Sequence, residues 1–111
     1  MSSNELSEVE FSSGNLWADV GRPDADEALA RAELMSRVTD IIRRRRLTQA
    51  RAAELLDTNQ PTVSDLMRGK LSKFSLGRLM TFLNALGKDV EIRVRPADSD
   101  RAGRVIVTPA E

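Results

Sequence analysis

Between residues 47 and 69, two short runs of apolar residues at helical spacing are separated by a polar turn. The first run comprises Ala52, Ala53, Leu55 and Leu56, and the second comprises Val63 and Leu66. Apolar side chains three and four positions apart lie on one face of a helix, so each run predicts an amphipathic helix. The turn is made by Asp57, Thr58 and Asn59. This pattern predicts a helix-turn-helix.

Residues suited to helix ends bound both predicted helices. Thr48 is a good N-cap for the first helix, and Asn59 can cap the second, with Pro61 in its first turn, where the missing N–H costs nothing. Gly69 suits the left-handed position that ends a helix. Two helices crossing steeply over a short turn must approach closely, and Ala53 is small enough to permit this.

The second helix would present a polar face away from the core, formed by Gln60, Pro61, Ser64, Asp65 and Arg68. Most of these residues lie at its N-terminal end, which is the end that enters a DNA major groove in helix-turn-helix proteins. The alternative is an ordinary αα-hairpin, because its short turn and buried alanine would give much the same pattern.

A longer helix is predicted on each side of this pair. The one before it opens at Asp24, with Glu27 completing a capping box, and its apolar stripe is Leu34, Met35, Val38, Ile41 and Ile42. The one after it is capped by Ser75 and closed by Gly87, and Phe74 seals the loop beneath it. Its wide apolar face is formed by Leu76, Leu79, Met80, Phe82, Leu83 and Leu86.

The apolar period changes to two after residue 88. Val90, Ile92 and Val94 alternate with charged residues before Pro96, which predicts a strand with one buried face. Its partner is either the same strand of a second subunit or a hairpin strand at 105–107, and both can hold together. The predicted fold is thus mainly α, a bundle of four to five helices at 23–87 with a C-terminal strand or hairpin and tail at 88–111, used in dimerisation.

Charge is distributed unevenly along the 111 residues, although the formal net charge is zero. Residues 1–33 hold eight acids and two bases, a net of −6, whereas residues 34–80 hold ten bases and four acids, a net of +6. The basic block contains the predicted helix-turn-helix, as expected of a protein that binds DNA phosphates. The run Arg43–Arg46 lies within it and can complement the preceding helix dipole, bind phosphate, or do both.

The amino-acid composition excludes several of the sites that enzymes use for catalysis. The chain has no Cys and no His, which excludes thiolate or imidazole metal sites, a Ser-His-Asp triad and a disulfide. We therefore expect no catalytic residues, no metal and no cofactor. No basic region is followed by an apolar stretch near the N-terminus, and no apolar run approaches the length of a membrane span, so we expect a cytoplasmic protein without membrane contact. If the predicted helix-turn-helix binds DNA, we expect the protein to be associated with the nucleoid while it is bound.

Residues 1–22 have the composition of a flexible acidic arm. They are rich in Ser, Asn and Glu, a composition that rarely folds alone. Their apolar residues are few, and Phe11, Leu16, Trp17 and Val20 are the candidates for binding a partner protein. Trp17 either folds back onto the helical domain or anchors in a groove of that partner, where Trp is enriched.

The segments LTQ, AAELL and QPTVSDLMRG resemble the lambda-repressor-like (XRE) helix-turn-helix family. Over residues 15–96 the chain is similar to the HigA-type antitoxins of bacterial type II toxin-antitoxin pairs, most specifically in the arm before Pro23 and the strand after LNALGKD. The resemblance implies a DNA-binding antitoxin that neutralises a small RelE-like or HigB-like ribosome-dependent mRNA endoribonuclease and represses its own operon. It also implies a homodimer on a palindromic operator. The family usually has Gly at the positions of Arg46 and Asp57.

The resemblance assigns roles within the helix-turn-helix. Base edges would be read by Gln60, Pro61, Ser64 and Asp65. Phosphates would be contacted by Thr48, Gln49, Thr62, Arg68, Lys70 and Lys73. Gln60 suits adenine, whereas Asp65 is a departure that either accepts from cytosine or repels the duplex.

Two other functions fit the same residues. One is a stand-alone or phage-type XRE transcriptional regulator without a toxin partner, in which Trp17 packs on its own domain. The other is a protein-interaction module that has lost DNA recognition, which an acidic residue on the reading helix would favour.

Overall fold

The structure, a computed structural model, describes residues 23–98 and 102–108. The helical elements in chain order are α2 (Pro23–Arg44), α3 (Gln49–Leu55), α4 (Gln60–Met67), the 3-10 turn η2 (Leu71–Lys73) and α5 (Leu76–Ala85). All of them fall within the domain predicted at 23–87. The four α-helices of the described ranges, with a helix-turn-helix among them, confirm the mainly α fold. The predicted arm, with Phe11, Leu16, Trp17 and Val20, lies outside the described residues.

The predicted side-chain caps start three of the helices. The side chain of Thr48 accepts a hydrogen bond from the Arg51 N–H at 3.0 Å, and that of Asn59 accepts from the Thr62 N–H at 2.8 Å. Ser75 Oγ accepts from the Arg78 N–H at 3.1 Å. Each cap satisfies an N–H that has no partner within its helix, so the sequence located these starts correctly. Helix α2 differs, since it begins at Pro23, one residue before the predicted opening.

In the part of the chain that the structure describes, four residues take the left-handed backbone conformation, and all four end a helix or form a turn. Gly69 and Gly87 do so with φ of 74° and 87°, as their positions predict. Arg46 and Asp57 do so with φ of 55° and 57°, at the two positions where the XRE family usually has Gly. A side chain in this region costs about 1–2 kcal/mol, so both junctions are held there by the packing around them.

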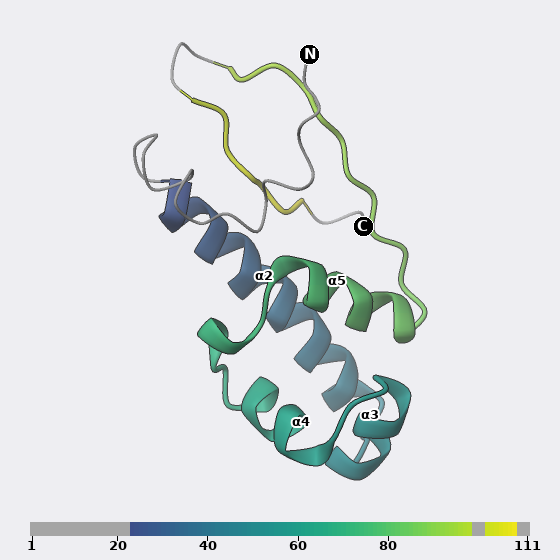
Figure 1. Cartoon of the computed structure of the whole chain (residues 1–111). Coiled ribbons are helices and arrows are strands. Elements are labelled where there is room, and N and C mark those ends of the chain that lie inside the picture. The colour runs from purple at the N-terminus through teal and green to yellow at the C-terminus, as the bar shows by residue number, and fades with distance from the viewer. Residues whose placement is uncertain (1–22, 99–101, 109–111) are drawn as a thin grey trace.

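Helix α2 is the spine of the domain, with α5 packed across it and α3 and α4 packed together at its C-terminal end (Figure 1). The core takes side chains from every α-helix, and Val38, Val63, Leu66 and Leu79 are fully buried within it. Ala53 is also buried in this core, and its helix, α3, packs against α4. Phe74, which directly follows η2, is buried, with its ring edge-on to that of Phe82 at 6.1 Å between centroids.

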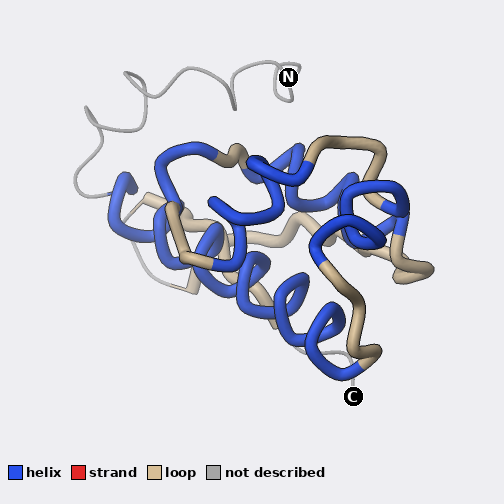
Figure 2. Tube along the Cα trace, turned by 90° about the horizontal axis from the view of Figure 1, so that it is seen from below, coloured by secondary structure: helices blue, strands red, loops and turns tan. Residues whose placement is uncertain are grey.

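The strand predicted over Val90, Ile92 and Val94 is absent from the described residues, which contain helices and loops only (Figure 2). Val90 packs against the core, but Ile92 is 67% and Val94 95% exposed. The hairpin with 105–107 is not formed either. A strand needs a neighbour for its backbone hydrogen bonds, and the single chain supplies none here. The strand prediction is therefore wrong for the isolated chain, although apolar and charged residues do alternate along this segment.

None of the helices in the described ranges is both long and apolar enough to cross a membrane.

Candidate nucleic-acid interface

Helix α4 is seated in the core by one face and presents the other to solvent. Val63 and Leu66 are 0% exposed and anchor it, whereas Gln60 and Pro61 are exposed in its first turn. Ser64 lies one turn further on and is half-buried. Gln60, Pro61 and Ser64 therefore share one face, and the N-terminal end of that face is exposed to solvent.

Three of the residues predicted to contact phosphates lie at the starts of α3 and α4, where two of them take part in helix capping. The Thr48 hydroxyl oxygen is occupied as the cap of α3, and Gln49 follows it, exposed at the first position of that helix. Thr62 is half-buried, and its N–H is bound by the Asn59 side chain. Gln49 is thus the freest of the three side chains to reach a phosphate.

A basic loop follows α4. Arg68 is the exposed C-cap residue of α4, Lys70 immediately precedes η2, and Lys73 is the last residue of η2. The carboxylate of Asp65 lies between the two lysines, with Oδ1 at 3.3 Å from Lys70 Nζ and Oδ2 at 3.4 Å from Lys73 Nζ. Partial burial raises the pKa of this carboxyl, but hydrogen bonds from Lys70 and Lys73 and their positive charges outweigh it and leave the pKa below its ordinary value. Asp65 is therefore ionised and paired at neutral pH.

Two arginines that the sequence analysis did not single out position this region. Arg31 on α2 donates from Nη1 to the Leu71 carbonyl at 3.1 Å and pairs with Glu27 at 3.2 Å, which ties η2 to the spine helix. Arg78 at the start of α5 lies 5.4 Å from the ring centroids of both Phe74 and Phe82. The (i, i+4) spacing of Glu27 and Arg31 was visible in the sequence, but their 40-residue link to η2 was not.

The four arginines at 43–46 make different contacts at the end of α2. Arg45 donates to the Leu86 carbonyl at 2.8 Å, so it satisfies the C-terminal end of α5 rather than that of its own helix. Arg44 pairs with Asp40 at 3.0 Å, and Arg46 forms the left-handed turn. A structural role is therefore clear for Arg45, whereas the exposed side chain of Arg43 is open to a phosphate.

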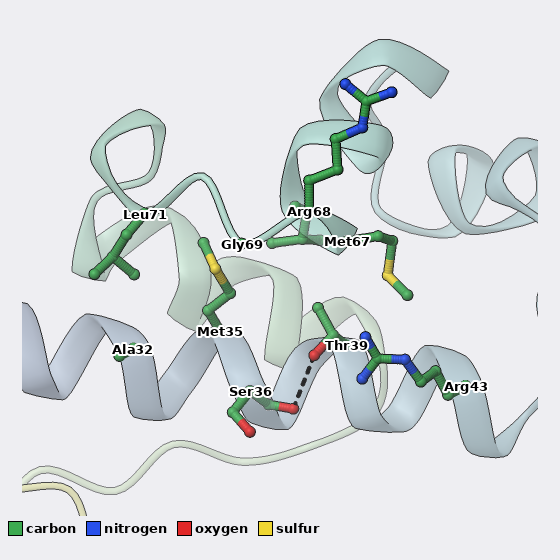
Figure 3. Close-up of a pocket in the computed structure, with 10 residues that line it drawn as sticks. Ala32, Met35, Ser36, Thr39, Arg43, Met67, Arg68, Gly69 and Leu71 are labelled. Carbon is green, nitrogen blue, oxygen red and sulfur yellow. Dashed lines mark hydrogen bonds between the residues drawn. The ribbon is translucent and has the colours of Figure 1, made fainter.

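A shallow groove of about 370 Å³ runs between α2 and the C-terminal end of α4 (Figure 3). Met35 and Met67 line it, and the hydroxyl of Thr39, itself buried, donates to the Ser36 carbonyl at 3.1 Å. Arg43 lies back along α2 towards Thr39, whereas the Arg68 guanidinium points away from the groove. The two guanidinium groups do not converge, so the groove lacks the paired donors of an anion site.

Comparison with known proteins identifies the family. Residues 16–95 match the family model described as a helix-turn-helix domain, which is most of the chain. The chain belongs to this helix-turn-helix family. A solved structure whose name places it among XRE family transcriptional regulators is 46% identical, with a TM-score of 0.72. The match covers 78% of this chain and 99% of that one, so this helix-turn-helix protein belongs to the XRE family. No curated protein matches it.

The XRE fold brings the predicted base-reading and phosphate-binding positions together at α3, α4 and η2, while the predicted dimerisation residues lie apart from them in the segment after α5.

Proposed function

We propose that the protein is a sequence-specific DNA-binding transcriptional regulator that inserts the N-terminal end of α4 into the major groove. The observation that carries the proposal is the seating of α4, because Val63 and Leu66 fix its buried face while Gln60 and Pro61 stay exposed. The side-chain amide of Gln60 can pair with N6 and N7 of adenine, and Pro61 offers apolar contact to a thymine methyl. Ser64 can hydrogen-bond to either kind of base edge.

The surrounding charges suit the backbone of the same duplex. In our proposal Gln49, Arg68, Lys70 and Lys73 contact phosphates, with backbone support from Thr48 and Thr62 at the helix starts. Arg68, Lys70 and Lys73 are exposed and lie within a sequence block of net charge +6. Such contacts provide most of the affinity and none of the sequence information. Membership of the XRE family supports this division of labour.

Replacing Gln60 and Arg68 separately should distinguish base reading from phosphate binding. In Gln60→Ala we expect operator affinity to fall roughly 5- to 150-fold, the loss of a base contact of about 1–3 kcal/mol, with little effect on unrelated DNA. In Arg68→Ala we expect binding to the operator and binding to unrelated DNA both to weaken, and the slope of log affinity against log salt concentration to become shallower by about one. Gel-shift titrations at several salt concentrations measure both effects.

Arg93→Ala is the matched control, since Arg93 is an exposed arginine outside the helix-turn-helix. If operator affinity and its salt dependence stay unchanged in both test variants, α4 does not read DNA.

We further propose that the protein binds a palindromic operator as a homodimer. The extended segment after α5 exposes Ile92 and Val94, which are costly to leave in water and are spaced two residues apart. The strand that a single chain does not form could form against the same segment of a second copy. Two reading helices would then contact successive major-groove faces about 34 Å apart.

The second candidate function adds a toxin partner, as in HigA-type antitoxins. The feature that favours it is the acidic N-terminal third, with a net charge of −6 over residues 1–33. Its described part exposes Leu29 on α2, at 68% of its surface. A ribosome-dependent RNA nuclease must bind a polyanion, so it presents a basic surface, and an acidic arm carrying Trp17 is complementary to such a surface.

Co-expression with the neighbouring open reading frame tests the toxin partner. We expect a short RelE-like product that arrests growth alone and is neutralised by the full chain, whereas deletion of residues 1–22 should abolish rescue. Colony counts on inducing medium measure the effect. Gln60→Ala is the control and should still rescue, because it changes only the DNA-reading face. A harmless neighbour, or rescue by the deletion variant, would leave the regulator without this partner.

A further inference from the structure

Asp65 occupies an unusual place for an acidic residue, on the helix proposed to approach a polyanion. Its two carboxylate oxygens are divided between two lysines, Oδ1 towards Lys70 at 3.3 Å and Oδ2 towards Lys73 at 3.4 Å. The Asp65 side chain is 24% exposed and the lysine side chains are 43% and 56% exposed. One carboxylate thus makes the contacts to both amines that a backbone phosphate would otherwise make.

The loop itself does not depend on this carboxylate. The Lys70 N–H donates to the Asp65 backbone carbonyl at 3.1 Å, and the Lys73 N–H donates to the Lys70 carbonyl at 3.1 Å. Arg31 holds the Leu71 carbonyl from α2 at 3.1 Å. None of these three contacts involves the Asp65 carboxylate, so we expect the ion pairs to act on the lysine amines rather than on the course of the loop.

We propose that Asp65 is a positioning residue that holds the amines of Lys70 and Lys73 in one geometry and thereby disfavours binding to DNA that lacks the operator sequence. The proposal rests on the DNA-binding function proposed above. It replaces base reading by Asp65 with an electrostatic role: the three side chains together carry one net positive charge instead of two, and they carry it in fixed positions.

The physical reason lies in the difference between the two binding modes. In the operator complex α4 fixes the register, so the phosphates meet the lysines where Asp65 already holds them. On other DNA the protein samples many registers, and the lysines must leave Asp65 to follow the phosphates. Binding of the second kind is almost entirely electrostatic, so the competing carboxylate weakens it most. The carboxyl of Asp65 is ionised at neutral pH, and the two lysines lower its pKa further, so the competitor carries its full charge.

The test compares Asp65→Asn with the wild type on operator and unrelated duplexes across a range of salt concentrations. We expect affinity for unrelated DNA to rise roughly 10-fold at low salt, with a salt slope steeper by about one to two, since each freed lysine adds about 0.9. Operator affinity should change less, so the preference for operator falls about 10-fold. Asp89→Asn, the same change at an exposed site after α5, should alter neither value.

A variant that lacks both lysine amines tests whether Asp65 acts through them. In a Lys70→Gln, Lys73→Gln variant, adding Asp65→Asn should have no further effect on unrelated DNA, because there are no amines left to free. Unchanged binding of unrelated DNA by Asp65→Asn would overturn the proposal. So would a loss confined to operators with one particular base pair, because that result assigns Asp65 to base reading.

A measurement without DNA separates this proposal from the function on which it rests. Carboxyl ¹³C NMR titration should give Asp65 a pKa below its ordinary value in the wild type, returning towards it in the double lysine variant. An ordinary wild-type pKa would refute the ion pairs themselves. If the wild type instead shows no preference for any operator, the DNA-reading function fails while the pairs stand.

Discussion

Leu66→Ala should destabilise the domain by about 3 kcal/mol, within the 2–5 kcal/mol range of fully buried leucines. Leu66 is 0% exposed and anchors the buried face of α4 in the core that α2 and α5 share. Its truncation removes apolar contacts and leaves a cavity directly beneath the proposed reading face. For a domain of this size we expect the melting temperature to fall by roughly 12–24 °C, measured by circular dichroism.

Leu29→Ala is the matched control, since it is the same substitution on a helix but at a side chain that is 68% exposed. We expect a change within about 0.5 kcal/mol, because little apolar surface is lost from the core. Equal destabilisation by the two variants would show that α4 is not anchored by this leucine.

Ile92→Asp combined with Val94→Asp should convert the proposed dimer to monomers and lower operator affinity at least 100-fold. Two linked reading helices gain about 10²- to 10⁴-fold over one, because the second binding step is intramolecular. The domain should stay folded, since both side chains are largely exposed in the single chain. Val90 is left unchanged because it packs against the core. Sedimentation velocity and gel shifts measure the two effects.

Glu91→Ala combined with Arg93→Ala provides the control in the same segment, at the alternating polar positions. We expect its dimer and its operator affinity to match the wild type. Persistence of dimers in the aspartate variant would place the subunit interface elsewhere in the molecule. A monomer with undiminished operator affinity would instead show that a single reading helix suffices.

Local chemistry was enough to predict the helices and most of their ends. Thr48, Asn59 and Ser75 cap helices because each hydroxyl or amide oxygen reaches an N–H only three residues away. Gly69 ends α4 because it tolerates a positive φ without a side-chain clash. Such interactions depend on neighbours in the sequence, so the chain specifies them before it folds.

The candidate site was predictable as a set of positions but not as a set of contacts. Helical periodicity placed Gln60 and Pro61 on the open face of α4, which the structure bears out. It could not show that Asp65 would face Lys70 and Lys73, because the path of the loop after α4 is set by its packing against α2. Asp65 therefore looked like a defect in a reading face, whereas the fold pairs it with two amines.

The sequence by itself determined the helices, their caps, the buried faces and the basic character of the helix-turn-helix block, since all of these follow from residue type and spacing. Only the tertiary structure decided the links that join distant segments, such as Arg31 to the Leu71 carbonyl and Arg45 to the Leu86 carbonyl. It also decided against a strand in the single chain. The reason is the same throughout: a hydrogen bond between distant residues forms only where packing brings both partners together.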